Sequence, residues 1–99
     1  MASFRLRQRA DADLISIWHW THDNWSPSQA DDYIDSLTAM MAMLADDPTR
    51  GRAADTVSPG LYRMNCQAHV IFYRRVSEGV EIVRVLHGRM NLPRHLKDE

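Results

Sequence analysis

The stretch from residue 60 to residue 89 constrains the fold more than any other part of the chain, because it has the pattern of three short strands joined by tight turns. Runs rich in β-branched and aromatic residues predict strands at Leu61–Cys66, His69–Val76 and Val80–His87. Gln67-Ala68 and Ser77-Glu78-Gly79 supply the turns, and Gly79 suits a positive φ. The last strand is apolar on both sides except at Arg84, which is typical of an interior strand.

A strand and an amphipathic helix are predicted before this region. Apolar and polar residues alternate from Phe4 to Arg7, which predicts a strand with one buried face. From Ala10 to Trp25 apolar residues recur with helical spacing, so we expect a helix whose apolar stripe faces the sheet. The stripe comprises Ala10, Leu14, Ile17, Trp18, Thr21 and Trp25. Trp20 lies off this stripe, either at the rim of the core, which we favour, or exposed to a partner.

The second helix has the clearest start in the sequence. Ser26 is placed to cap it, Pro27 suits the first helical position, and Gln29 completes a capping box. The apolar stripe that follows comprises Ala30, Tyr33, Ile34, Leu37, Met40, Met41 and Leu44. Only Asp23 and Asn24 lie between the two helices, so we expect an antiparallel hairpin.

The remaining segments complete the predicted fold. Residues 49–60 are rich in turn formers and predict a loop, and Asn91 can cap a short last helix. The 99 residues suit one domain, 1–99. The predicted class is α+β: an N-terminal strand, an antiparallel helical hairpin packed on a small, mainly antiparallel sheet, and a short C-terminal helix.

Charge is distributed unevenly along the chain. Residues 1–49 hold three basic and eight acidic residues, a net charge of −5, whereas residues 50–97 hold nine basic and three acidic residues, a net charge of +6. Eleven of the twelve basic residues are arginines, which suit bidentate recognition of carboxylate or phosphate. Arg63, Arg75 and Arg89 alternate toward one side in the strand region, so we expect a cationic sheet that contacts an anionic or polar partner.

Composition excludes several classes of protein and site. No apolar run approaches the roughly 18 residues of a membrane span, and the N-terminus lacks an apolar signal core, so we expect a cytoplasmic protein without membrane contact. The single cysteine, Cys66, excludes an internal disulfide and a cysteine-based zinc cluster. His19 and His22 are three residues apart, but no third ligand has a diagnostic spacing. We therefore expect neither a metal nor a cofactor.

RNA cleavage is the one enzymatic activity that the residues leave open. Arginines can stabilise a phosphorane-like transition state while a histidine, tyrosine or glutamate moves protons. The parts would come from Arg63, Arg84, His87, Arg89 and His95. No set among these residues completes an acid–base pair, so we predict no catalytic residues.

Six ordered segments cover nearly the whole chain and have the spacing of a known family. They are Ala10-x-x-Asp13-Leu14-x-x-Ile17-Trp18, Trp25-x-x-x-x-Ala30-x-x-Tyr33, Pro48-x-x-Gly51-Arg52, Gly60-Leu61-Tyr62-Arg63, His69-x-Ile71-Phe72-Tyr73 and Ile82-Val83-Arg84-Val85-Leu86-His87-Gly88-Arg89-Met90. Together they resemble the ParE branch of the ParE/RelE toxin superfamily. The resemblance implies the toxin of a type II toxin–antitoxin module that inhibits DNA gyrase and blocks replication. It also implies neutralisation by a ParD-like antitoxin whose disordered tail folds along the toxin.

The resemblance also suggests two sets of contact residues. For the toxic target we expect Arg63, His87, Arg89, Arg94 and Lys97, and for the antitoxin the off-stripe positions Trp20, Ala39, Ala42 and Met43. We expect no sequence-specific DNA binding by this chain alone. RelE-like relatives instead cut mRNA on the ribosome, but here no tyrosine follows Tyr73 and the only late lysine is Lys97, which favours the ParE interpretation. A ribosome-dependent mRNA endonuclease is the first alternative, and a non-toxic interaction module is the second.

Overall fold

The computed structural model describes residues 2–89 together with Arg94 and Leu96. The elements are β1 (Ser3–Leu6), α1 (Gln8–Asn24), α2 (Pro27–Asp46), the 3₁₀ turn η1 (Pro48–Arg50), β2 (Arg52–Ala53), β3 (Tyr62–Cys66), β4 (His69–Val76) and β5 (Gly79–His87). They form one five-stranded sheet in the order β1-β5-β4-β3-β2, in which β1 runs parallel to β5 and the other pairs are antiparallel. The predicted α+β class and the interior position of the last strand are confirmed.

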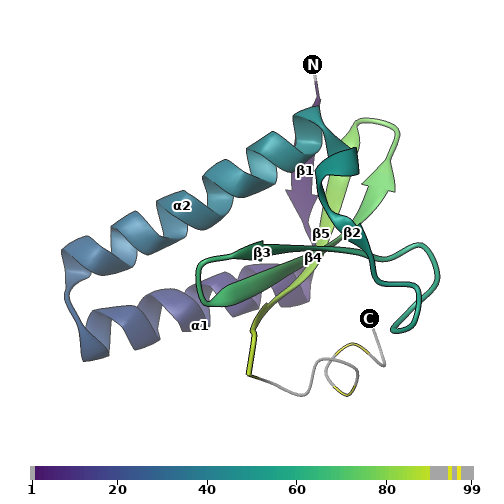
Figure 1. The fold of residues 1–99 in the computed structure, drawn as a ribbon. Coiled ribbons are helices and arrows are strands. Elements are labelled where there is room, and N and C mark those ends of the chain that lie inside the picture. The colour runs from purple at the N-terminus through teal and green to yellow at the C-terminus, as the bar shows by residue number, and fades with distance from the viewer. Residues whose placement is uncertain (1, 90–93, 95, 97–99) are drawn as a thin grey trace.

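The two helices form an antiparallel hairpin that covers one face of the sheet (Figure 1). The main core lies between these layers. Its fully buried side chains come from both helices and from β4 and β5, and they include Leu37, Met41, Ile71, Tyr73 and Ile82. No helix in the part of the chain that the structure describes is long and apolar enough to cross a membrane.

A smaller core lies on the opposite face of the sheet. Phe72, Val83 and Leu86 pack there under Ala54 and Leu61, which flank the loop between β2 and β3. Leu96 also belongs to this cluster and is 1% exposed, so this residue contributes to the packing of the sheet. The predicted short C-terminal helix, including Asn91, Pro93 and Lys97, falls largely outside the described residues.

Local sequence explains where the elements begin and turn. Ser26 Oγ accepts a hydrogen bond from the Gln29 backbone N–H at 3.0 Å, so the predicted N-cap of α2 is confirmed. Gly79 has φ of 145°, and a Cβ at this position would lie 2.0 Å from the Ser3 carbonyl oxygen of β1. Glycine is therefore required both by the turn and by the parallel pairing of β1 with β5.

Several predictions about single segments are wrong. Residues 49–60 are not one loop, because Arg52 and Ala53 pair with β3 as a fifth strand. Trp25 is not part of the buried stripe: α1 ends at Asn24, and the Trp25 side chain is 66% exposed. Trp20, which we favoured for the rim of the core, is 61% exposed.

The predicted one-sided row of arginines is also wrong. Arg63 stands beside Phe72 in the smaller core, with its guanidinium carbon 5.7 Å from the ring centroid. The Arg75 guanidinium instead lies 4.2 Å from the centre of the Tyr62 ring, which packs on the main core. The two arginines therefore project from opposite faces of the sheet.

Candidate functional site

A groove of about 810 Å³ lies beneath the tip of the helical hairpin, where the helices extend past the turn between β3 and β4 (Figure 1). Trp20, Thr21 and Trp25 line one side of it, and Gln29, Asp32, Tyr33 and Ser36 of α2 line another. Gln67, Ala68, His69 and His87 from the end of the sheet line the remainder. The groove exists because the sheet ends before the hairpin does, which leaves part of the inner face of the helices uncovered.

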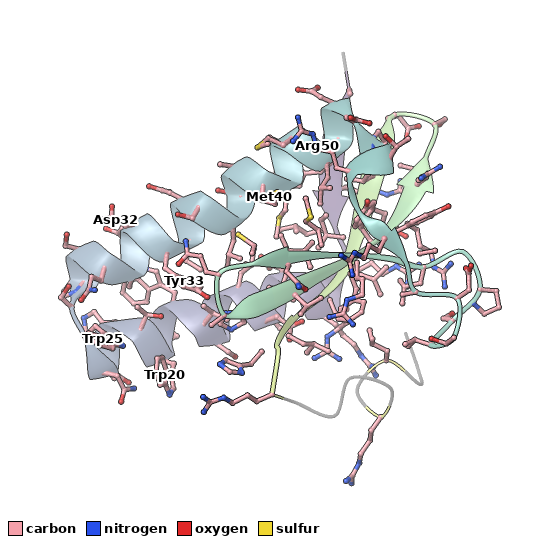
Figure 2. All side chains as sticks on the ribbon, in the orientation of Figure 1. Trp20, Trp25, Asp32, Tyr33, Met40 and Arg50 are labelled. Carbon is pink, nitrogen blue, oxygen red and sulfur yellow. The ribbon has the colours of Figure 1, made fainter. Side chains whose placement is uncertain are left out.

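Two tryptophans expose a large apolar surface at this end of the molecule. Figure 2 shows Trp20 and Trp25 at the tip of the hairpin, with Tyr33 between α2 and the β3–β4 turn. Each indole is more than half exposed, although burial of an aromatic side chain of this size would stabilise the fold by several kcal/mol. Exposed aromatic side chains beside a groove are typical of a protein-binding surface.

A polar contact network forms the floor of the groove. The Tyr33 hydroxyl lies 2.6 Å from His69 Nδ1 and accepts the Ala68 backbone N–H at 3.3 Å. Burial, and to a smaller extent the neighbouring His87, lower the pKa of His69, so the neutral ring is favoured and its Nδ1 accepts from the Tyr33 hydroxyl. The His69 and His87 rings meet edge to face at 5.3 Å. Burial raises the pKa of Tyr33, so the hydroxyl keeps its proton.

A mostly buried ion pair joins α1 to β5. Asp13 Oδ2 and Oδ1 accept from Arg84 Nε at 2.7 Å and Nη2 at 2.9 Å, and Asp13 Oδ2 also accepts the Val85 backbone N–H at 2.9 Å. The pairing of β1 with β5 ends at Ile82, so the backbone N–H of Val85 has no partner in β1. Asp13 accepts the hydrogen bond of this N–H in place of a strand. The sequence contains both residues within the quoted motifs, but it gave no sign that they form a pair.

The proposed antitoxin contacts fall in two places. Trp20 lines the groove, whereas Ala39, Ala42 and Met43 are exposed on α2 outside its lining. Met43 lies seven residues after Ser36 and therefore continues the groove side of α2, as Ala39 does. Ala42 lies off that line. The sequence did not indicate that Trp25, Tyr33 and His69 belong to the site. The exposure of Trp25 and the contact between Tyr33 and His69 depend on where the helices and strands end.

The proposed target contacts do not form one cluster. His87 lines the groove on the helical side, whereas Arg63 lies on the opposite face of the sheet and donates to Asn65 Oδ1 at 3.4 Å. Arg89 and Arg94 are exposed beyond the end of β5, and Lys97 lies outside the described residues. Among the candidates for RNA cleavage, Arg84 is bound by Asp13, Arg63 is separated from His87 by the sheet, and His95 lies outside the described residues.

Metal ligands do not gather among the described residues. No group of three or more histidine, cysteine or acidic side chains is placed to hold an ion there. His22 stacks on Trp18 at 5.0 Å and contacts Asp23 at 3.1 Å, so it has ordinary surface partners. Burial raises the pKa of the Cys66 thiol, which favours its unreactive protonated form.

Comparison with known proteins identifies the family. The family model described as the ParE toxin of the type II toxin–antitoxin system parDE matches residues 4–92. A toxin named ParE1 from Caulobacter vibrioides is 42% identical over 96 residues, which cover 97% of this chain and 99% of the relative. A ParE1 toxin from Mycobacterium tuberculosis is 38% identical over 94 residues, covering 94% and 96% of the two chains. The Escherichia coli toxin ParE is 31% identical over 99 residues, covering 99% and 96%.

A solved structure agrees at the level of the fold. A chain of the chromosomal ParDE toxin–antitoxin system from P. aeruginosa superposes with a TM-score of 0.76 at 18% identity, covering 88% of this chain and 96% of that one. The family match extends from β1 to beyond the end of β5, so it includes both helices, the sheet and every described residue of the groove. This chain therefore belongs to the ParE toxin family of type II toxin–antitoxin systems.

Proposed function

We propose that this ParE-family toxin inhibits DNA gyrase and is neutralised by a ParD-like antitoxin that occupies the groove beneath the hairpin tip. The observation that carries the antitoxin site is the groove itself, with Trp20 and Trp25 exposed beside it. An amphipathic helix or extended segment that inserts apolar side chains there would remove both indoles from water. The segment is expected to continue along α2 past Ser36 toward Ala39 and Met43.

Charge supports a basic or neutral antitoxin segment at this site. Asp32 lines the groove, and Asp31 and Asp35 are exposed on the same helix. Among the described groove residues, only the two histidines are able to carry positive charge. A segment with apolar anchors and a lysine or arginine directed at Asp32 fits this distribution.

Binding of the cognate antitoxin, measured by titration calorimetry, tests the site. Trp20→Ala is expected to weaken binding about 30-fold, because a buried aromatic anchor contributes about 2 kcal/mol. Ile15→Ala is the matched control, since Ile15 is 54% exposed on α1 but does not line the groove. Met43→Asp tests the extension along α2. Folding of the segment on contact predicts a large negative heat-capacity change. Equal affinity of the Trp20 and Ile15 variants would place the antitoxin elsewhere.

Gyrase is proposed as the target because the residues that RNA cleavage would require are held apart. Arg84 is bound to Asp13, and the sheet separates Arg63 from His87. Arg89 and Arg94 are proposed to contact gyrase or its DNA from the exposed end of β5, together with Lys97. His87 and Arg63 remain proposed target contacts.

Induction of the chain alone in a bacterium separates the three possible functions. Filamentation with DNA-damage signalling is expected, together with loss of supercoiling when the purified chain is added to gyrase. Translation arrest with cleaved mRNA would favour the ribonuclease, and normal growth would favour a non-toxic module. If His87→Ala abolished toxicity together with mRNA fragments, the gyrase proposal would fail.

The C-terminal contribution needs a variant that preserves the core. Deleting residues 91–99 would remove Leu96, which is 1% exposed, and would therefore destabilise the sheet as well as remove cations. The double variant Arg94→Gln, Lys97→Gln keeps Leu96 and is expected to reduce toxicity. Arg9→Gln, which removes a cation from the start of α1, serves as the control. Full toxicity of the double variant would exclude the C-terminal cations from the target contact.

A further inference from the structure

The face of the sheet opposite the helices carries arginines from four strands. Phe4, Leu6, Val80 and Ile82 point into the main core, so the alternating residues Arg5 and Glu81 point to the opposite side. Arg74 is two residues after Phe72 in β4, so it points to the same face as this residue of the smaller core. Arg52 lies directly opposite Arg63 in the β2–β3 ladder, and Arg63 lies opposite Phe72 in the β3–β4 ladder, so both arginines share that face. We call this surface the back face and define it by Arg5, Arg7, Arg52, Arg63, Arg74 and Glu81.

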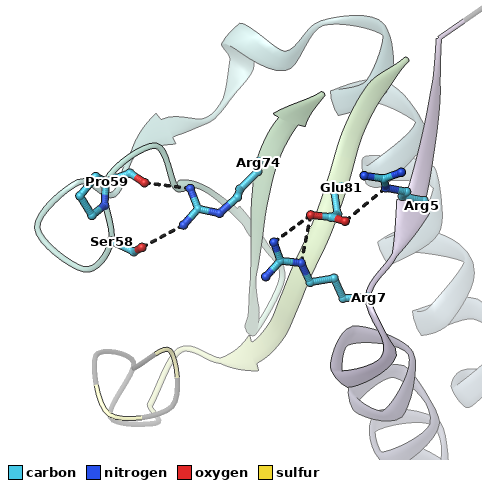
Figure 3. Close-up of polar contacts among 6 residues, drawn as sticks. All are labelled: Arg5, Arg7, Ser58, Pro59, Arg74 and Glu81. Atoms are coloured by element: carbon cyan, nitrogen blue, oxygen red, sulfur yellow. Dashed lines mark hydrogen bonds and ion pairs between the residues drawn. The ribbon is translucent and has the colours of Figure 1, made fainter. Parts of the chain in front are cut away.

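The back face has far more positive than negative charge. Glu81 Oε2 lies 3.2 Å from Arg5 Nε, and Glu81 Oε1 lies 2.9 Å from Arg7 Nη2 (Figure 3). One carboxylate therefore forms ion pairs with two guanidinium groups. Arg74 donates to the Pro59 carbonyl at 2.8 Å and to Ser58 Oγ at 2.9 Å (Figure 3). The residues that define this face therefore comprise five guanidinium groups and one carboxylate, and Glu78 lies near Arg5 at its edge, where a hydrogen bond from Ser77 and, to a smaller extent, the charge of Arg5 lower the pKa of the Glu78 carboxyl.

Arg52 and Arg63 are the least neutralised pair. They are cross-strand partners, a placement that brings Cβ atoms to about 5 Å and is destabilising for like charges. Neither of them forms an ion pair with a carboxylate of the described residues, and the guanidinium of Arg63 contacts the Asn65 amide oxygen and the Phe72 ring, which carry no charge. A bound anion would relieve the repulsion between them.

The rest of the surface accentuates this asymmetry. The two helices carry exposed aspartates, which include Asp11, Asp23, Asp31, Asp35 and Asp46. The uneven charge of the sequence therefore becomes a difference between two sides of the molecule, with an acidic helical side and a basic back face. Such a field orients the chain so that the back face approaches a polyanion first.

We propose that the back face binds the phosphodiester backbone of duplex DNA without sequence preference. Strands are about 4.8 Å apart, so arginines distributed from β1 to β2 span roughly 19 Å, and a DNA strand has a phosphate about every 3.4 Å along its axis. Arginine binds phosphate oxygens in a bidentate manner. The inference rests on the proposed function and deepens it, since gyrase acts on DNA and a toxin that contacts both would be held at the enzyme–DNA complex.

Two features favour duplex backbone over other anionic partners. Single-stranded nucleic acid is usually bound through exposed aromatic side chains, and the described aromatic residue on this face, Phe72, is fully buried. Protein partners usually bury an apolar or aromatic centre. The apolar side chains of the smaller core on this face are buried apart from the half-buried Val57, so this surface offers backbone contacts more than an apolar anchor.

Fluorescence anisotropy of a labelled 20-base-pair duplex with the purified full chain tests the inference. Binding at 50 mM KCl is expected to be equal for unrelated sequences, and log K is expected to fall with log[KCl] with a slope of about −3.6 if four phosphates are neutralised. Arg52→Gln and Arg63→Gln should each make the slope shallower, reducing its magnitude by about 0.9. Arg50→Gln is the matched control, because Arg50 pairs with Asp47 at 3.8 Å at the end of α2, and it should leave the slope unchanged.

Four results would overturn the inference. They are no duplex binding at 50 mM KCl, equal slopes for the Arg52 and Arg50 variants, tighter binding of a single strand, and binding of polyglutamate as tight as that of the duplex. The last would indicate an acidic protein surface as the partner. Gyrase is absent from this assay. Inhibition of supercoiling without DNA binding would therefore refute this inference alone, whereas DNA binding without inhibition would refute the proposed function.

Discussion

The carboxylate of Asp13 links helix α1 to β5 through hydrogen bonds. Replacing Asp13 with asparagine tests how much these bonds contribute to the free energy of unfolding. The two oxygens of Asp13 accept three hydrogen bonds at 2.7–2.9 Å, two from Arg84 and one from the Val85 backbone. Asparagine has nearly the same shape but presents an NH₂ group where one oxygen accepts. One donor on β5 would then face another donor and lose its partner.

The structure sets the size of the effect. The Asp13 and Arg84 side chains are 14% and 15% exposed, so the pair is mostly but not fully removed from water. Breaking a fully buried pair costs about 3–5 kcal/mol, and partial access of water to Arg84 reduces this, so we expect Asp13→Asn to cost about 2–3 kcal/mol. In a domain of this size that loss lowers Tm by about 8–24 °C.

Urea unfolding followed by tryptophan fluorescence measures this loss. Asp11→Asn is the matched control: Asp11 is exposed in the first turn of the same helix, and its favourable interaction with the helix dipole is at most about 1 kcal/mol. In the Asp13→Asn background, a further Arg84→Met change should cost less than the same change in the unmodified chain, since the carboxylate that binds Arg84 is already absent. Equal stability of the Asp13 and Asp11 variants would refute the view that this pair joins α1 to the sheet.

Three further predictions concern the stability of the fold. Leu37→Ala should cost about 2–5 kcal/mol in urea unfolding, because Leu37 is fully buried, and a loss below about 0.5 kcal/mol would show that α2 is wrongly registered. Gly51→Ala should cost at least about 1–3 kcal/mol, because its Cβ would clash with the Tyr73 hydroxyl oxygen and lie 2.8 Å from the Arg63 carbonyl oxygen, whereas Gly88→Ala, whose Cβ would lie 3.6 Å from its nearest neighbour among the described residues, should be nearly neutral. Burial lowers the pKa of His69 below its ordinary 6.5, so the unfolded chain binds a proton more readily. Thermal stability should therefore fall as the pH drops from 7.5 to 5, and His69→Gln should flatten that dependence; an unchanged dependence would assign it to other groups.

Periodicity within each segment was enough to predict most of the fold. The stripes of the two helices, the Ser26 cap and the strand–turn–strand pattern after residue 60 each depend on residues close together in the chain. Such short-range patterns are read directly from sequence, because a helix or strand presents one face at a fixed period. The family resemblance then supplied the toxin class, which the family match confirms.

The placement of arginines depended on contacts between strands. The register of β3 against β4 places Arg63 opposite Phe72, so these two side chains share one face of the sheet. Arg75 is three residues after Phe72 in β4 and therefore points to the other face, where it contacts Tyr62. An irregularity between Phe72 and Tyr73 shifts the pairing with β5 as well. A shift of one residue reverses the face of every side chain, so alternation in separate strands does not predict a shared surface.

The sequence by itself determined both helices, four of the five strands, most of their apolar faces and the charge difference between the two halves of the chain, because these depend on residue type and local spacing. Only the tertiary structure decided that the helices extend past the sheet and open a groove, that Asp13 meets Arg84, and that Tyr73 meets the segment before β2. In the last contact the Tyr73 hydroxyl donates to the Pro48 carbonyl and accepts the Gly51 N–H. These features join residues at least 22 positions apart, and such contacts are fixed by the lengths and registers of packed elements rather than by any local pattern.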